Sequence, residues 1–206
     1  MLLELDDSQL VLVDYQTRLL PAIHDGPAVL ANARRLAKLA HLLKVPLFAT
    51  EENPSGLGPT APELQALIQQ AGGKMLAKMQ FSAVEEGLGE MLRPESPQRV
   101  PQGNARSLPK HLQKPAAAQA QRNTVVMAGC ETHVCLLQTA LDLLEDEFDV
   151  WVVTDACGSR TERNRDAAFD RLAGAGAELV TTEMVAFEWL RGAEHPAFKD
   201  VLALLK

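Results

Sequence analysis

Short apolar runs alternate with helical patterns along this chain, and the alternation constrains its fold more than any other feature. Between the runs, apolar residues recur every three or four positions, as in the stripe Val29, Ala33, Leu36, Ala40 and Leu43, which is typical of an amphipathic helix. Strands joined by helical crossovers are parallel, and uninterrupted apolar runs suit a sheet that helices cover on both faces. We therefore predict an α/β fold with an open, doubly wound, mostly parallel sheet of about six strands. The predicted strands are residues 9–13, 45–50, 73–77 (the weakest), 124–129, 148–156 and 177–182.

Helix start signals support the same organisation. Thr60 with Glu63, and Ser159 with Glu162, have the spacing of a capping box, in which a hydroxyl and a carboxylate satisfy the first free N–H groups of a helix. Further helices are expected at residues 132–144, 183–191 and 196–206.

The whole chain, residues 1–206, is expected to form one domain, because its length suits a single core of ordinary size. Residues 93–122 break the pattern, since they are rich in proline and polar residues and lack periodicity. A structureless loop of that length is uncommon in a compact domain. We interpret this segment as a proline-rich insertion that either reaches over the site or is disordered.

Charge and cysteine content limit the possible partners and compartment. A net charge of −7 and a pI near 5.3 argue against nucleic-acid binding, which usually needs a basic surface. No apolar run approaches the roughly 20 residues needed to span a bilayer, and the N-terminal stretch has acids where a signal peptide carries positive charge. The 3 cysteines do not form a disulfide framework. The sequence therefore predicts a cytoplasmic protein with no nucleic-acid partner and no membrane partner.

The stretch "GCETHVC", residues 129–135, holds the densest group of reactive side chains. Cys135 is expected in the first turn of a helix, where free N–H groups and the helix dipole favour a thiolate and could bind an oxyanion. The spacing from Cys130 to Cys135 is too long for a Cys-x-x-Cys redox pair, and a zinc site lacks a second ligand pair. Cys130 and Cys157 are expected in the core, and His133 is expected to take no part in the chemistry.

Ligands of doubly wound sheets bind at the carboxyl ends of the strands. Asp14 directly follows the first predicted strand, and a buried carboxylate there is costly unless it is paired; it either caps a turn or serves a site. Lys78 on its own reads as a lysine whose stem lies along apolar surface. The other segments at strand ends are residues 50–53, 129–135 and 155–159.

Three motifs together resemble the isochorismatase-like (cysteine hydrolase) family. That family has an Asp after the first strand, a Lys shortly before Phe-Ser, and the pattern Gly-x-x-Thr-x-x-Cys-Val-x-x-Thr-Ala. This chain reads "LVLVDYQ", "KMQFS" and "GCETHVCLLQTA", with Leu136 in place of the usual Val. It is most similar to the small isochorismatase-domain-containing proteins, whose substrates are mostly unassigned. The matching residues are Asp14, Lys78, Phe81, Ser82, Gly129, Thr132, Cys135, Thr139 and Ala140.

The resemblance implies a role for each matching residue. Cys135 would be the nucleophile, Asp14 would take its proton and pass it to a leaving amine, and Lys78 would lower the pKa of the thiol. The backbone N–H groups of Glu131 and Cys135 would form the oxyanion hole, with a cis peptide bond between Cys130 and Glu131. The expected substrate-binding residues are Gln16, Asn53, Phe81 and Leu136.

Nicotinamidases of this family carry an Asp-x-His metal motif after the second strand. The corresponding segment here, "TEENPSGLGPT", lacks that motif. We therefore predict no metal and no cofactor. Because Cys135 is present, we predict a cysteine hydrolase with a small-molecule substrate, in which it cleaves an amide, imide or carbamoyl C–N bond through a Cys135 thioester. Two alternatives stay open: an idle family member that acts as an interaction protein, and a vinyl-ether hydrolase of the isochorismatase type. A dinucleotide-binding Rossmann domain fails, because no Gly-x-Gly-x-x-Gly loop follows the first strand. The resemblance also implies a homo-oligomer, either a homodimer or a homotetramer.

Overall fold

The computed structural model describes residues 1–94 and 121–206 and contains one parallel sheet of six strands in the order β3-β2-β1-β4-β5-β6. All five neighbouring strand pairs are parallel, so the predicted fold class is confirmed. The chain starts in the middle of the sheet, builds one half outward to β3, and then crosses back to build the other half. The strands are β1 (Ser8–Val13), β2 (Leu47–Glu52), β3 (Lys74–Lys78), β4 (Thr124–Gly129), β5 (Asp149–Val153) and β6 (Glu178–Val180).

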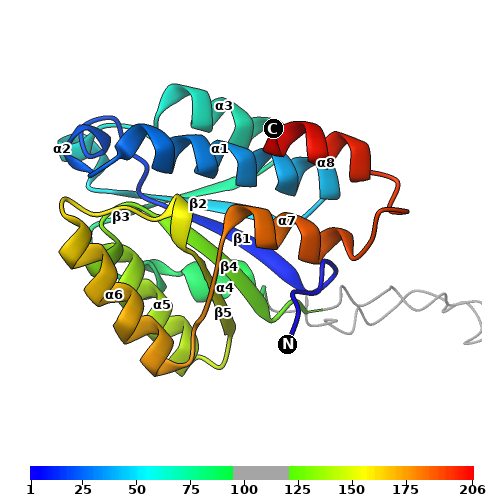
Figure 1. Ribbon diagram of the computed structural model, residues 1–206. Coiled ribbons are helices and arrows are strands. Elements are labelled where there is room, and N and C mark those ends of the chain that lie inside the picture. Colours follow the sequence, from blue (N-terminus) through cyan, green and yellow to red (C-terminus); the bar gives the residue numbers. More distant parts are fainter. Residues whose placement is uncertain (95–120) are drawn as a thin grey trace, which may run out of the picture.

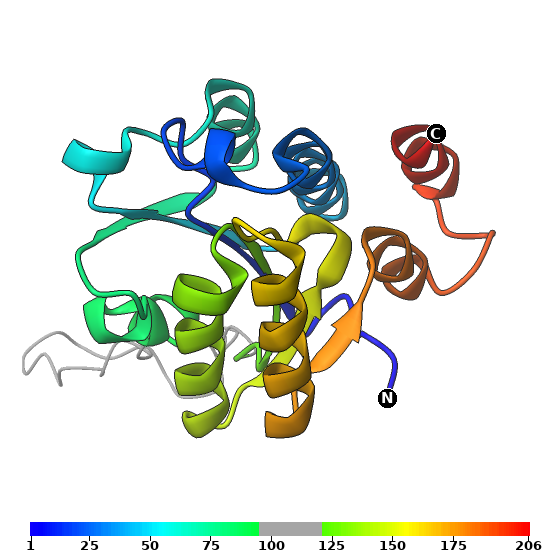
Figure 2. The ribbon, with the colours of Figure 1, turned by 60° about the vertical axis from the view of Figure 1, so that its left-hand side comes forward.

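Helices cover both faces of this sheet. The helices α1 (Gly26–Leu43), α3 (Pro62–Gln70), α7 (Thr182–Leu190) and α8 (Phe198–Leu205) lie on one face. The helices α4 (Leu88–Leu92), α5 (Leu137–Glu145) and α6 (Glu162–Ala175) lie on the other (Figure 1). Figure 2 shows α5 and α6 side by side in front of the sheet. The short segments are α2 (Pro54–Leu57), the 3₁₀ turns η1 (Leu20–Ala22), η2 (Val84–Glu86) and η5 (Thr154–Ala156), and the π-helical turn η4 (Thr132–Leu136).

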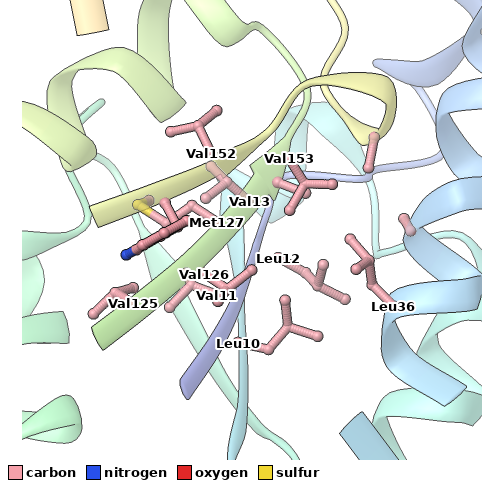
Figure 3. Packing of buried hydrophobic residues seen from close by; sticks show 14 of the residues in the cluster. Leu10, Val11, Leu12, Val13, Leu36, Val125, Val126, Met127, Val152 and Val153 are labelled. Atoms are coloured by element: carbon pink, nitrogen blue, oxygen red, sulfur yellow. The ribbon is translucent and has the colours of Figure 1, made fainter. Parts of the chain in front are cut away.

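The core is centred on β1 and β4, where every residue is buried. Leu12 of β1 points toward Leu36 of α1, and Val126 and Met127 of β4 lie beside β1 (Figure 3). These central strands are apolar on both faces because helices cover both, as the uninterrupted apolar runs predicted. The edge strand β3 differs, since only its last residue, Lys78, is buried.

Several predicted boundaries are wrong for local reasons. Thr60 does not cap a helix, because its hydroxyl donates to Glu51 and the N-cap residue of α3 is Ala61. The cap of α6 is Thr161, whose hydroxyl accepts from the Asn164 N–H, and not Ser159. The strand predicted at 148–156 stops at Val153 and continues as a 3₁₀ turn.

Most of the predicted proline-rich insertion at 93–122 lies outside the described residues. Among the residues that the structure does describe, no helix combines the length and the apolar character needed to cross a bilayer.

Candidate active site

The predicted site residues meet where the strand order reverses, between β1 and β4. Asp14 directly follows β1, and Cys135 lies in η4, which begins after Cys130 and Glu131 at the end of β4. Val13 pairs with Gly129 across these two strands, so both segments leave the sheet at the same edge. Lys78 ends β3 two strands away and reaches this edge with its long side chain. This is the position at which open parallel sheets usually bind ligands.

The Lys78 ammonium lies between two carboxylates. Its Nζ is 2.9 Å from Asp14 Oδ2 and 2.8 Å from Glu52 Oε2, and it also donates to the carbonyl oxygens of Gln80 and Phe81 at 3.3 and 3.2 Å. The Thr50 hydroxyl donates to Asp14 Oδ1 at 2.7 Å. Asp14 Oδ2 has no aligned hydrogen-bond donor among the described residues, so its contact with Lys78 is an ion pair.

The two carboxylates keep Lys78 charged. Burial alone would lower the pKa of this lysine, but the charge of Asp14 and the hydrogen bond to Glu52 raise it above its ordinary value. Glu52 was not among the predicted site residues. It pairs with Lys78 in the register of β2 and β3, so the sheet itself places the two side chains together.

Cys135 completes the cluster. Its Sγ and one carboxylate oxygen each of Asp14 and Glu52 all lie within 4.8 Å of one another, and the residue is only 4% exposed. Burial raises the pKa of this thiol well above its ordinary range, the Asp14 charge raises it further, and Lys78 opposes both. The resemblance implied that Lys78 lowers the pKa of this thiol, and its charge does act in that direction, but burial and the Asp14 charge outweigh it. The balance favours the protonated thiol beside the Asp14 carboxylate.

The backbone before Cys135 turns through a left-handed residue. Glu131 has φ 51° and ψ 58°, a region that non-glycine residues occupy in only a few per cent of cases. The described residues contain no cis peptide bond, so the predicted cis bond between Cys130 and Glu131 is wrong. The N–H of Glu131 has no hydrogen-bond partner within the described part of the chain.

The Glu131 side chain holds this turn in place. Its Oε1 pairs with Arg160 Nε at 3.0 Å, and its Oε2 lies 3.2 Å from His133 Nδ1. The second contact is close enough for an ion pair but is not aligned as a hydrogen bond. His133 also lies 3.0 Å from the Ser159 hydroxyl and 3.3 Å from Asn164 Nδ2, so His133 belongs to the support of the turn.

The remaining motif residues tie the segments together. A Cβ on Gly129 would lie 2.6 Å from Val13 Cβ and 2.8 Å from its carbonyl oxygen, so only glycine allows the ends of β1 and β4 to approach this closely. Thr132 binds the Gly158 carbonyl through both its N–H and its hydroxyl, each at 3.0 Å. The Thr139 hydroxyl accepts from the Ala83 N–H at 3.0 Å, which fastens the segment after Lys78 to α5.

The four expected substrate-binding residues differ in position. The Gln16 amide is buried and binds the backbone of Glu52 and Gly58, so it positions Glu52. Asn53 caps α2 by accepting from the Gly56 N–H. Leu136 is fully buried, whereas Phe81 is 52% exposed beside Lys78.

The other two cysteines are buried, as predicted, at 0% exposure for Cys130 and 2% for Cys157. Burial raises the pKa of Cys157 to about 12 and that of Cys130 well above its ordinary value.

The donor atoms of Asp14, Glu52 and Cys135 are also close enough for a metal site. The Lys78 ammonium, however, touches both carboxylates and already supplies the positive charge there. A divalent cation would have to displace it, so these residues suit a lysine-centred site better.

A surface cavity of about 440 Å³ lies elsewhere. Leu2, Met184 and Phe187 line it, and it shares no residue with the cluster around Cys135. We place the site by its chemistry, because four interacting functional groups at the strand ends are a more specific signal than surface shape.

The sheet order, with its acid, lysine and cysteine at the reversal point, defines an isochorismatase-like hydrolase fold. The Isochorismatase domain model matches residues 8–100 and 110–184, and the chain belongs to this family. Isochorismatase domain-containing protein 2A of Mus musculus is 36% identical over 201 residues, which cover 98% of this chain and 84% of the mouse protein.

Solved structures agree with this assignment. A structure described as MAR1 ribonuclease from Caenorhabditis elegans superposes with a TM-score of 0.81 at 29% identity, covering 100% of this chain and 92% of its own. The YcaC gene product from Escherichia coli, described as an octameric hydrolase of unknown specificity, gives 0.76 at 28% identity, with 100% and 87% covered.

Proposed function

We propose that this protein is a cysteine hydrolase that cleaves a small amide, imide or carbamoyl C–N bond through a thioester on Cys135, without a metal. One observation carries the proposal: a buried thiol, a carboxylate and an ammonium lie together at the reversal point of the sheet. A nucleophile with a base in reach, and a third group that orients the base, is the general arrangement of covalent hydrolases.

The first step uses the neutral thiol. Asp14 removes the Cys135 proton as Sγ forms a bond to the substrate carbonyl carbon, and the carbonyl electron pair moves to oxygen. The backbone N–H groups of Glu131 and Cys135 donate to that oxyanion. Removal of one such donor typically slows a reaction by about 10²–10³-fold.

The tetrahedral adduct then collapses. The C–N bond breaks, the nitrogen takes the proton from Asp14, and an amine leaves a thioester on Cys135. Water, deprotonated by Asp14, attacks the thioester, and Cys135 recovers its proton as the acid departs. Lys78 keeps its charge throughout and stabilises the negative charge that passes between Asp14 and Sγ.

The test is a panel of small amides, imides and carbamoyl compounds, with release of amine or ammonia as the assay and intact mass as the probe of an acyl adduct. We expect an adduct on Cys135 in the wild type and no turnover by Cys135→Ala. Cys157→Ala is the matched control, because that thiol is buried outside the cluster, and it should turn over normally. Turnover by Cys135→Ala at the wild-type rate would falsify the mechanism.

The site geometry supports the cysteine hydrolase better than the two alternatives, an idle interaction protein and a vinyl-ether hydrolase. An idle interaction protein has no use for a thiol beside a buried carboxylate and ammonium, and a panel without any adduct or turnover would favour that reading. A vinyl-ether substrate would need no nucleophilic thiol. RNA belongs in the panel because of the ribonuclease description of one neighbour, but two carboxylates in the site and a net charge of −7 oppose a phosphodiester.

We also propose that the chain forms a homo-oligomer. The octameric YcaC neighbour supports this, and light scattering that gives the 22.4 kDa mass of one chain would contradict it.

A further inference from the structure

Glu52 is a second carboxylate in the candidate site, and the proposed reaction gives it no part. Its Oε2 is 2.8 Å from Lys78 Nζ, and its side chain is 11% exposed, whereas the side chains of Asp14 and Lys78 are 0% exposed. Glu52 Oε1 makes no hydrogen bond or ion pair with any described residue. Glu52 is therefore the member of the charged group that a solute reaches first, and one of its oxygens is free to accept.

The backbone of Glu52 is fixed on both sides by one amide. Gln16 Nε2 donates to the Glu52 carbonyl at 2.9 Å, and the Glu52 N–H donates to Gln16 Oε1 at 2.9 Å. The neighbouring carboxylate, Glu51, is directed elsewhere and binds the N–H and hydroxyl of Thr60 at 2.7 and 2.8 Å. Successive side chains of a strand point to opposite faces, so only Glu52 faces the site.

The charges in the cluster do not balance. The cluster sets two carboxylate groups, those of Asp14 and Glu52, against one ammonium, that of Lys78, which contacts both. The centre therefore carries one net negative charge close to Sγ. Because the groups are buried, salt screens this charge only weakly, so it acts on any solute that approaches the sulfur.

We propose that Glu52 determines the charge specificity of this site, so that it takes amides or carbamoyl compounds with N–H donors or a positive charge beside the reacting carbonyl and rejects carboxylate-bearing ones. Glu52 Oε1 accepts a hydrogen bond from that donor while Oε2 stays on Lys78. The substrate then supplies the positive charge that the cluster lacks. The proposal rests on the proposed function, because it names the substrate class of the same site.

The test uses labelling of Cys135, which needs no turnover. Three methanethiosulfonates of similar size carry a cationic 2-aminoethyl, a neutral ethyl or an anionic 2-sulfonatoethyl group. The thiol sulfur forms a disulfide with the reagent, methanesulfinate leaves and the thiol proton goes to solvent. The rate constant for each reagent is measured by peptide mass and divided by its rate constant with 2-mercaptoethanol, which removes intrinsic differences in reactivity.

In the wild type the cationic reagent should react at least about tenfold faster than the anionic one, as expected for a unit charge within a few ångström in a partly buried site. Glu52→Gln keeps the shape and the Gln16 contacts and should bring this ratio close to one. Glu51→Gln removes the same charge from the adjacent residue and should leave the ratio unchanged.

Three results would overturn the proposal. They are a wild-type ratio at or below one, an equal effect of Glu51→Gln and Glu52→Gln, and no labelling of Cys135 by any of the three reagents. The wild-type ratio decides the matter even if Glu52→Gln folds poorly. If the cationic reagent labels Cys135 faster as expected while Cys135→Ala still turns over substrate, only the thioester mechanism is refuted. Failure of the charge-specificity proposal is therefore distinguishable from failure of the proposed function.

Discussion

Replacement of Lys78 by methionine should destabilise the protein strongly, since it removes the ammonium that lies between two buried carboxylates. Asp14 and Glu52 would then face each other without compensation, and the carbonyl oxygens of Gln80 and Phe81 would lose their donor. Breaking a buried ion pair by removal of one partner costs about 3–5 kcal/mol. For a chain of this size that corresponds to a fall in Tm of about 10 °C.

The matched control is Lys74→Met on the same strand. Lys74 is exposed, and its ammonium lies 5.8 Å from the centre of the Phe48 ring, a contact worth at most about 1 kcal/mol. Urea unfolding at pH 7 measures both variants. A third protein, with Asp14→Asn, Glu52→Gln and Lys78→Met together, removes every charge of the cluster and should regain most of the lost stability.

Two outcomes would refute this reasoning. If Lys78→Met is no less stable than Lys74→Met, the ammonium does not compensate the two carboxylates. If the uncharged triple variant is as unstable as Lys78→Met, the loss comes from packing of the lysine stem and not from charge.

Two further predictions concern the backbone and the thiols. Gly129→Ala should lower the free energy of unfolding by about 1–3 kcal/mol, because the added methyl overlaps Val13. The control is Gly174→Ala, in the exposed end of α6 with nothing near its Cβ, which should raise the free energy of unfolding by about 0.5–1 kcal/mol. Equal effects of the two variants in urea unfolding would contradict this prediction. The folded-state pKa of Cys157, about 12, lies above the ordinary 9.0, so the folded state holds the proton more tightly. The contribution of this thiol to stability is then complete below about pH 9 and is lost as pH rises toward 12, at up to about 1.4 kcal/mol per pH unit. Cys157→Ala should make the fall in stability between pH 9 and 11 shallower, and an unchanged slope would argue against this assignment.

The sheet was predictable because the burial of each central strand is reflected in its amino-acid composition. Central strands buried on both faces read as apolar runs, and the polar residues that follow them stand out. Asp14 and the Gly129–Cys135 stretch were found in this way, and the family motifs added Lys78. Helix starts were less predictable, because Thr60 and Ser159 have tertiary partners that no local pattern reveals.

Glu52 shows what the sequence did not reveal. Glu51 and Glu52 are adjacent, and only the pairing of β2 with β3 decides which of them faces Lys78. The raised pKa of the Cys135 thiol was missed for a related reason. The helix terminus and Lys78 are visible in the sequence, but the burial that outweighs them is a property of the assembled fold.

The exposed edge strand has a consequence for folding fidelity. A strand whose register shifts by one residue exchanges its two faces, and register is weakly specified where neither face is buried. Residues 74–77 of β3 are exposed or only partly buried, so their apolar content selects no alignment. Lys78 selects the alignment, because only one register of β3 brings its ammonium between Asp14 and Glu52. The lysine that serves the proposed chemistry thus also fixes the register of the edge strand β3 against β2.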